Sequence, residues 1–532
     1  MARSKIHGMF RLVIAACLLS ASTANAQAPA KTKPTLVVFI TVDQLASDYL
    51  ERYGGNFTGG LDRIRTQGAT WVRGLHDHAI TETAPGHAST MSGRFPVHTG
   101  ITSNSQGVNT ADAPLVAGTG PGASPFRFRG TTLHDWMKAA DPATRSMSVS
   151  RKDRGAILPI GRAKTEVYWF SEDGRFTTST YYRDRLPAWV DAFNARRVPQ
   201  SYAGKSWVPL LHPDRYAEPD TMSVESGGVD YTFPHVVPAD SAAAAAAFSQ
   251  YPWMDSLTLA FALEGARRME LGASASRTDL LAISLSTTDA VGHRYGPDSK
   301  EIHDQLLRLD RYLGAFLDSL FAMRDSRRIV IALTADHGVA PYPEARSPYY
   351  ANEGAQRTSQ AAAWGLMMER LRGAGIDTTA LHYDDGVRVR DAAAFRRANT
   401  DPDDFARIWV REMRRQTGVL RADLVSDLAR MDTTHDDIAR RWLHMFAPGG
   451  DVRAVSTLKP FGYWAGVNYA THGQAHDYDA RVPIMFWGAG IVAGERGTTA
   501  RVVDMAPTLA AWLGISPLER LDGRALPLTT AP

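Results

Sequence analysis

Four short apolar runs constrain the fold of this 532-residue chain more than any other feature. None of them shows the polar alternation of a half-exposed strand, so each predicts a strand that is buried on both faces. Amphipathic patterns with helical spacing lie between and after them. The predicted strands are residues 36–42, 280–285, 329–333 and 482–487, and the predicted helices are residues 255–272, 299–323, 360–373 and 503–514.

This alternation predicts an α/β fold, a three-layer α/β/α sandwich around a mostly parallel central sheet. Two stretches fit the rhythm of the sheet poorly, at about residues 161–250, which are rich in Tyr, Trp, Pro and Gly, and at about residues 341–463. We interpret both as insertions that cap a site on one catalytic domain, residues 27–532. The alanine run at 242–247 predicts a plain helix segment.

The first 26 residues have the layout of a secretory signal peptide. A basic stretch precedes a short apolar core, and Ala24-Asn25-Ala26 is a small-x-small cleavage site. The apolar core is shorter than the ~20 residues that a transmembrane helix needs, and no later segment is long enough. We therefore expect cleavage after Ala26 and a periplasmic or secreted protein without a transmembrane segment. A lipoprotein signal ending at Cys17 is the alternative.

Composition excludes several kinds of chemistry. The chain's single cysteine is Cys17, within the predicted leader, so the mature chain offers neither a disulfide nor a thiolate ligand. There are 59 Lys and Arg against 56 Asp and Glu, and three of the basic residues lie in the leader. A balanced mature charge predicts neither nucleic acid nor an anionic membrane as a partner.

Acidic side chains and histidines follow the predicted strands. In open α/β sheets ligands bind beyond the carboxyl ends of the strands, which is where Asp43, Asp289 and Asp336 lie. Carboxylate and neutral imidazole are ligands that zinc selects, and three protein ligands per ion leave a position open for a substrate. The set is large enough for two ions. Its members are Asp43, Asp289, His293, Asp336, His337 and His472.

The spacing of two of these pairs has alternative interpretations. Asp289 and His293 are four residues apart, so they face one side of a helix and can grip one ion; alternatively they are a capping Asp and a surface His. Asp336 and His337 are adjacent at a strand end, where side chains splay apart. They bind one ion in an unusual geometry, face two ions, or form an ordinary turn with Gly338.

Thr83, in the sequence TAPGH, is the candidate nucleophile. Pro85 suits the first turn of a helix, which places Thr83 at a helix N-terminus, where free N–H groups favour an anion. A threonine hydroxyl is a poor nucleophile until a metal lowers its pKa. The alternatives are that Thr83 only caps the helix, or that Thr81 is the nucleophile.

Lys152 and Arg154 are the candidate substrate-binding cations. In an extended segment, residues two apart point the same way, so both could converge on one small dianion. Asn104, in GITSN, adds a neutral donor for the same anion. A solvated basic turn is the alternative for the Lys–Arg pair.

The order of these motifs resembles the alkaline phosphatase superfamily, and within it the phosphate-irrepressible (PafA-type) alkaline phosphatases. The similarity covers nearly the whole mature chain, and its specific part is the threonine together with the Lys-x-Arg pair. Relatives usually have an Asn and an aromatic residue where this chain has Ser105 and Gln106. The motifs are TAPGH, GITSN, KDRGAILP, STTDAVGH, TADHG, THG with the nearby Tyr478 and Asp479, and DMAPTLAAWLGI leading to LDGRAL.

The resemblance implies an exported phosphomonoesterase that forms a phosphothreonine at Thr83 and releases inorganic phosphate from small-molecule phosphate monoesters. It also implies two zinc ions per chain. One would be held by Asp289, His293 and His472, and the other by Asp43, Thr83, Asp336 and His337. Asn104, Lys152 and Arg154 would hold the phosphoryl oxygens.

Three other functions are alternatives to this one. A phosphodiesterase or nucleotide pyrophosphatase shares the metals and the threonine, but its substrate carries one charge fewer for Lys152 and Arg154 to neutralise. A sulfatase is disfavoured because Thr83 replaces the cysteine or serine that such enzymes oxidise. The third alternative is a non-catalytic exported protein that binds metal or phosphate. Such a protein would hydrolyse no phosphate ester.

Overall fold

The central sheet of the computed structural model has nine strands in the order β17-β2-β16-β9-β1-β8-β3-β4-β5. The structure describes residues 33–530, so the predicted signal peptide lies outside the described residues. β1 (Leu36–Val42) pairs in parallel with both β8 (Asp279–Leu285) and β9 (Ile329–Thr334). Within this sheet, β16 (Ile484–Gly488) and β5 (Phe176–Thr177) run antiparallel to their neighbours. The sheet is mostly parallel, as predicted.

All four predicted strands are confirmed, with ends that differ by at most two residues. Every residue of β1, β8 and β9 is buried, which is why their sequences are continuous apolar runs. The other strands of this sheet were not predicted from the sequence. These are β2 (Ala69–Leu75), β3 (Ser146–Ser150), β4 (Glu166–Phe170), β5 and β17 (Gly494–Arg501).

The stretch 161–250 differs from its interpretation as a capping insertion, because β4 and β5 within it extend the central sheet. The rest of the stretch is irregular, with a two-stranded sheet of β6 (Ser206–Trp207) and β7 (His235–Val236). α8 (Ser241–Ala247) contains the predicted alanine helix, and Asp240 caps it by accepting from two backbone N–H groups. Part of this stretch therefore belongs to the central sheet and not to a capping insertion.

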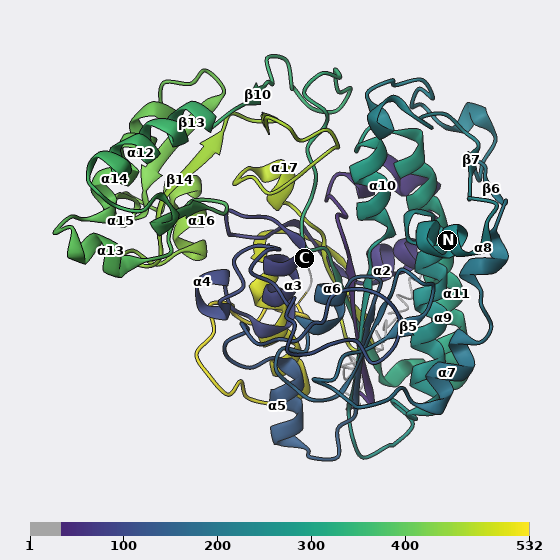
Figure 1. Ribbon diagram of the computed structural model, residues 1–532. Helices are drawn as coiled ribbons and strands as arrows, with labels where there is room; N and C mark the ends of the chain where they lie inside the picture. Colours follow the sequence, from purple (N-terminus) through teal and green to yellow (C-terminus); the bar gives the residue numbers. More distant parts are fainter. Residues whose placement is uncertain (1–32, 531–532) are drawn as a thin grey trace, which may run out of the picture. The chain divides into compact units, whose positions relative to one another are not determined.

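Helices cover both faces of the central sheet and make the three predicted layers (Figure 1). On one side lie α2 (Gly60–Gln67), α9 (Trp253–Arg268) and α11 (Lys300–Met323). On the other lie α3 (Thr83–Ser92) and α5 (Leu133–Ala140), which pack with α18 (Met505–Leu513). The remaining helices of this part are α1 (Tyr49–Tyr53), α4 (Pro96–Thr99), α6 (Asp153–Ile157), α7 (Ala188–Asn194), α10 (Thr287–Tyr295) and α17 (Asp477–Ala480).

Residues 361–458 form a second, four-stranded sheet with its own hydrophobic core, which we call the small subdomain. Its strands, in the order β11-β12-β14-β13, are β11 (Leu381–Tyr383), β12 (Val387–Val389), β14 (Val452–Leu458) and β13 (Val419–Leu424). Its helices are α12 (Ala361–Gly373), α13 (Ala392–Arg397), α14 (Pro402–Met413), α15 (Val425–Leu428) and α16 (Asp437–Met445). β10 (Arg357–Thr358) and β15 (Tyr463–Trp464) flank it as a short parallel pair.

The small subdomain falls within residues 341–463, where the sequence lacks the rhythm of the central sheet. Across residues 33–530, none of the helices combines the length and the apolar character that a membrane span requires.

Candidate active site

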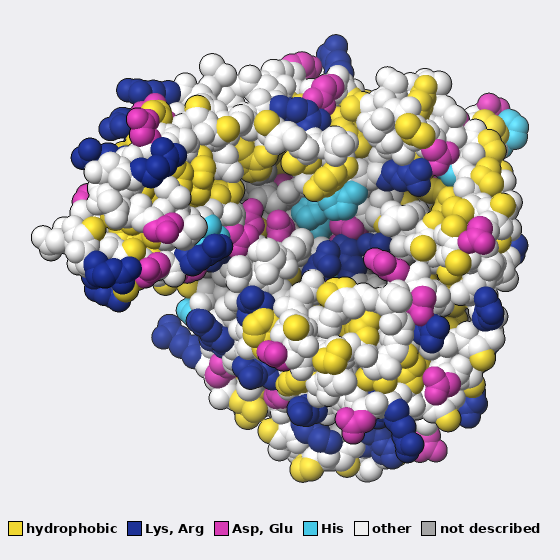
Figure 2. All heavy atoms as spheres, viewed as in Figure 1, with side chains coloured by type: hydrophobic (Ala, Val, Ile, Leu, Met, Phe, Trp, Pro, Cys, Tyr) yellow, Lys and Arg dark blue, Asp and Glu magenta, His cyan; other side chains and the backbone are white. Residues whose placement is uncertain are grey.

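Three carboxylates meet beyond the carboxyl ends of β1, β8 and β9. Asp43 directly follows β1, Asp336 lies two residues after β9, and Asp289 lies in the first turn of α10, which follows β8. All three are buried. Figure 2 shows histidine side chains in a hollow of the surface, with Lys and Arg side chains below them and Asp and Glu side chains beside them. The predicted edge of the sheet therefore carries a cluster of titratable groups.

The first group of possible metal ligands is Asp289, His293 and His472. His293 Nε2 lies 3.2 Å from Asp289 Oδ1 and 3.3 Å from His472 Nε2. The Nδ1 atoms of His293 and His472 lie 2.6 Å and 2.8 Å from the carbonyl oxygens of Ala470 and Thr81, so the hydrogen-bond network assigns the proton to Nδ1. Both Nε2 atoms are therefore free to accept a cation.

The second group is Asp43, Asp289 and His337. His337 Nε2 lies 3.5 Å from Asp43 Oδ1, 4.0 Å from Asp289 Oδ1 and 3.6 Å from Asp336 Oδ2. Asp336 and His337 thus do not splay apart, which favours the interpretation in which both side chains face one ion. Asp289 belongs to both groups, so the two groups adjoin each other.

The donor set of the second group fits a metal ion. His337 Nε2 and Asp43 Oδ1 are buried and have no hydrogen-bond partner in the described structure. Buried polar atoms without a partner destabilise a fold, and a bound cation would satisfy both at once. Carboxylate oxygen and imidazole nitrogen are ligands that suit zinc.

The pKa values of the cluster reflect its burial and its crowding of charge. Burial raises the pKa of Asp43 to about 7, and the carboxylates of Asp289 and Asp336 add to this shift. Burial acts in the same direction on Asp289, but Lys152 and His293 outweigh it and hold the pKa of Asp289 well below its usual range. Burial lowers the pKa of His472, which keeps its imidazole neutral, the form that binds metals.

Lys152 is held inside this cluster. Its Nζ lies 2.7 Å from Asp43 Oδ2, 2.7 Å from Asp289 Oδ2 and 3.2 Å from Thr83 Oγ1. The backbone of Lys152 is extended, but α6 begins at Asp153, so Arg154 is helical. The prediction that Lys152 and Arg154 share one extended segment is wrong. Arg154 Nε is nevertheless buried and has no described hydrogen-bond partner.

The candidate nucleophile is the first residue of α3. Glu82 precedes the helix with an extended backbone, so Thr83 is not the N-cap residue, and the interpretation of Thr83 as a mere cap is wrong. Gly86 lets α3 approach closely, because a Cβ atom there would collide with the Asp336 carbonyl oxygen. The hydroxyl of the competing Thr81 donates to the Gln474 carbonyl oxygen at 3.1 Å. Of the two threonines, Thr83 is the one whose hydroxyl oxygen accepts a hydrogen bond from Lys152 Nζ.

Two hydrogen bonds, to the chain neighbours of Thr83, hold Asn104 beside the start of α3. Its Oδ1 accepts from the Ala84 N–H at 2.9 Å, and its own N–H donates to Glu82 Oε2 at 2.7 Å. The side-chain amide group of Asn104 is thus oriented with its carbonyl toward the helix. Ser105 Oγ and Gln106 Nε2, which follow it, donate to the carboxylate of Asp384 in the small subdomain at 2.7 Å and 2.9 Å.

Three further residues of the site were not predicted from the sequence. His87 Nδ1 lies 3.0 Å from Asp336 Oδ2, while its Nε2 lies 2.8 Å from Ser284 Oγ. Gln44 donates its backbone N–H to Asp336 Oδ1 at 3.0 Å. Arg151 Nη2 lies 3.7 Å from Asp289 Oδ2. Only His87 had a visible signal, because it follows Thr83 by four residues in TAPGH and so shares its helix face.

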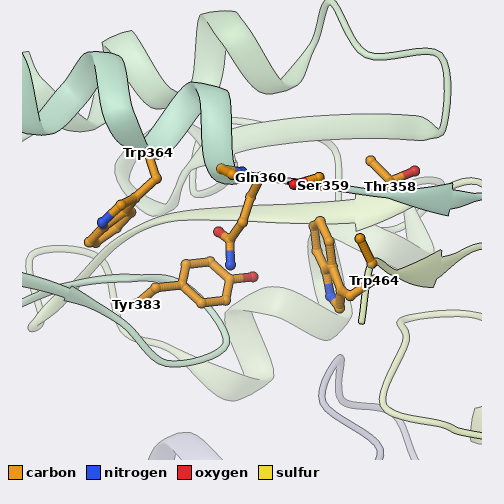
Figure 3. Close-up of a pocket in the computed structure, with 8 residues that line it drawn as sticks. Thr358, Ser359, Gln360, Trp364, Tyr383 and Trp464 are labelled. Atoms are coloured by element: carbon orange, nitrogen blue, oxygen red, sulfur yellow. Dashed lines mark hydrogen bonds between the residues drawn. The ribbon is translucent and has the colours of Figure 1, made fainter. Parts of the chain in front are cut away.

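A separate pocket of about 290 Å³ lies at the edge of the small subdomain. Figure 3 shows Trp364, Tyr383 and Trp464 around the side chain of Gln360. None of its eight lining residues is charged, so it offers no carboxylate or imidazole to a metal. The chemistry therefore belongs to the cluster at the sheet edge.

Comparison with known proteins agrees with this geometry. Residues 37–442 match the family model described as type I phosphodiesterase / nucleotide pyrophosphatase. The chain belongs to this family. It is 31% identical to alkaline phosphatase PhoK of Sphingomonas sp, over 94% of this chain and 92% of that protein. It is 30% identical to alkaline phosphatase PafA of Elizabethkingia meningoseptica, over 91% of this chain and 92% of that protein.

The solved structures agree with the sequence relatives. The crystal structure of wild-type alkaline phosphatase PafA superimposes with a TM-score of 0.84 at 27% identity, over 93% of this chain and 98% of that chain. The predicted membership in the alkaline phosphatase superfamily, with similarity to the PafA type, is confirmed. The chain is an enzyme of the alkaline phosphatase kind, with a candidate metal-binding group in its site.

Proposed function

We propose that this protein is an exported, zinc-dependent phosphomonoesterase that hydrolyses small-molecule phosphate monoesters through a phosphothreonine at Thr83. The observation that carries the proposal is the position of Lys152 Nζ, 3.2 Å from Thr83 Oγ1 and within 2.7 Å of two metal-ligand candidates, Asp43 and Asp289. The near full-length similarity to alkaline phosphatases supports the reaction class. Export to the periplasm or medium rests on the first 26 residues of the sequence.

Two zinc ions per chain are part of the proposal. Asp289, His293 and His472 would hold one ion, and Asp43, Thr83, Asp336 and His337 would hold the other. When bound, the metal supplies positive charge that favours ionisation of a hydroxyl and offsets the negative charge that develops during phosphoryl transfer.

The residues of the chain perform the remaining steps. Thr83 Oγ1 forms a bond to phosphorus while the bond from phosphorus to the leaving oxygen breaks. The proton that Thr83 loses is matched by one that the leaving oxygen takes up, so that oxygen leaves as an alcohol. A water oxygen then bonds to phosphorus, the bond to Thr83 breaks, and inorganic phosphate is released. Lys152 and Arg154 stabilise the charge on the phosphoryl oxygens, and the Asn104 amide donates to the same group.

One further solved structure supports the choice of these residues. A PafA variant in which a threonine is replaced by serine, and an asparagine, a lysine and an arginine by alanine, matches this chain with a TM-score of 0.84. Thr83, Asn104, Lys152 and Arg154 are the same four residue types, and the structure places Thr83 beside Lys152 and Asn104 beside Ala84.

Phosphodiester hydrolysis is the second candidate, because the matching family model carries that name. The charge of the site favours monoesters. A monoester dianion has one more negative oxygen than a diester, and Lys152 and Arg154 provide two cations for it.

The test is a comparison of 4-nitrophenyl phosphate with methyl 4-nitrophenyl phosphate after zinc has been restored to purified protein. The two substrates share a leaving group and differ in one charge. We expect a higher kcat/KM for the monoester. A higher kcat/KM for the diester would assign the protein to the phosphodiesterases, and no turnover of either ester would refute the proposal.

A further inference from the structure

A cavity of about 640 Å³ lies where the loop that carries Asn104 meets the small subdomain. Thr102 and Gln106 of that loop line it, together with residues of α4, of segment 126–129 and of segment 445–452. Its charged lining residues are Arg127, Arg129, Arg162, Arg388 and Asp451. The chain as a whole has nearly equal numbers of basic and acidic residues, so this excess of positive charge is local.

Three of these four arginines face the cavity with uncompensated charge. Arg388 is buried and paired, because its Nη1 lies 2.9 Å from Asp451 Oδ2 and its Nε lies 3.5 Å from Asp384 Oδ2. Within residues 33–530, by contrast, no carboxylate forms an ion pair with Arg127, Arg129 or Arg162.

The contacts of Arg162 and Arg127 hold segment 126–129 in place without neutralising its charge. Arg162 Nη1 donates to the carbonyl oxygens of Phe126 and Phe128 at 3.4 Å and 3.3 Å. The guanidinium of Arg127 lies 4.2 Å from the centre of the Phe126 ring. On the face shown in Figure 2, Lys and Arg side chains gather beside α4, next to the small subdomain. A concave surface with an excess of positive charge concentrates anions.

The cavity is joined to the candidate active site by a few residues of chain. Asn104 lies between Thr102 and Gln106, and its Oδ1 accepts from the N–H of Ala84, the neighbour of Thr83. Two residues of extended chain span at most about 7 Å, so the cavity wall and the contact with α3 belong to one short loop. Arg388 Nη2 donates to Thr102 Oγ1 at 3.1 Å and fixes the far end of this loop.

We propose that this cavity is a second anion-binding site, which takes the additional phosphoryl groups of multiply phosphorylated substrates. The inference rests on the proposed phosphomonoesterase function and names a substrate class for it. The volume of the cavity falls in the range of small-molecule pockets, about 300–1,000 Å³. All four cations are arginines, whose planar fork matches phosphate oxygens better than a lysine does.

The kinetic test compares fructose 1,6-bisphosphate with fructose 6-phosphate, which differ by one phosphoryl group. The variant is R127Q/R129Q, and the matched control is R370Q/R372Q, which removes the same charge from two exposed arginines of α12 that do not line the cavity. We expect kcat/KM for the bisphosphate to fall about tenfold or more in R127Q/R129Q, mainly through KM, a change that corresponds to ~1.4 kcal/mol. Fructose 6-phosphate should be affected about as little as in the control.

Equal losses on both substrates in R127Q/R129Q, or no loss on either, would overturn the inference. If both variants unfold at the same temperature as the parent, misfolding is excluded as the cause of a loss in kcat/KM.

A binding measurement separates this inference from the proposed function. Calorimetric titration with fructose 1,6-bisphosphate should show weaker binding to R127Q/R129Q than to the parent, even if the parent hydrolyses no ester. Titration with inorganic phosphate, which has the same anionic oxygens as a phosphoryl group, should show a smaller effect of the same two substitutions. Weaker binding of inorganic phosphate in the variant, with unchanged binding of the bisphosphate, would assign the cavity to free phosphate and overturn the inference.

Discussion

Replacing both Lys152 and Arg154 by alanine should remove two charge-assisted contacts to the transferred phosphoryl group. Lys152 Nζ already lies 3.2 Å from Thr83 Oγ1, and Arg154 Nε is a buried donor without a described partner. A hydrogen bond to a charged group contributes roughly 1.5–3 kcal/mol, so the pair contributes about 3–6 kcal/mol if the two effects add. At about 1.4 kcal/mol per tenfold change, kcat/KM for a monoester should fall by roughly two to four powers of ten.

The assay is kcat/KM for 4-nitrophenyl phosphate and for methyl 4-nitrophenyl phosphate in the parent and in K152A/R154A. The exposed Lys164 provides a control variant, Lys164→Ala. Because Lys152 also pairs with Asp43 and Asp289, thermal unfolding and zinc content are measured in parallel. Equal losses on both substrates, with zinc content unchanged, would refute the reasoning that the pair recognises the extra charge of a monoester.

Three further predictions follow from the site and its surroundings. Removal of zinc by a chelator should lower the Tm of the protein, because a ligand at 100 times its Kd stabilises a fold by about 2.7 kcal/mol. An unchanged Tm in thermal unfolding would contradict the proposed zinc ligands. His87→Ala should lower zinc affinity or kcat/KM roughly 10- to 100-fold, because His87 positions Asp336. Titration of the apo-protein with zinc measures the affinity, and kinetics after zinc restoration measure kcat/KM. Unaltered values would show that Asp336 needs no support from His87. Burial, together with Glu82 and Asp384, raises the pKa of Asp385 from 3.8 to about 8, so the folded state retains a proton that the unfolded state loses, and stability falls as pH rises through that window. Asp385→Asn should therefore gain stability relative to the parent between pH 5 and pH 8.5 in urea unfolding, and a pH-independent difference would show that Asp385 titrates normally.

The strands that the sequence predicted are those buried on both faces by apolar residues alone. β3 escaped prediction because its sequence, SMSVS, alternates serine with apolar residues like a half-exposed strand, yet all five residues are buried. One of its hydroxyls, Ser148 Oγ, donates to the Ala156 carbonyl oxygen, which offsets the cost of burial. β17 lies at the edge of the sheet, where polar residues such as Glu495 are exposed.

The acidic residues of the site were predictable because strand ends in a parallel sheet converge. The contacts of Lys152 with Asp43 and Asp289 were not, because they join segments more than a hundred residues apart. The bond from Gln106 to Asp384 spans 278 residues and depends on the small subdomain, whose position no local pattern reveals.

The role of Thr83 is tested most directly by trapping the covalent intermediate. Zinc-loaded enzyme turning over 4-nitrophenyl phosphate is quenched rapidly in acid, and the phosphorylated peptide is mapped by mass spectrometry. The account predicts phosphate on Thr83 in the parent and in Thr81→Ala, and neither turnover nor labelling in Thr83→Ala. Phosphate on Thr81, or turnover that survives in Thr83→Ala, would contradict it.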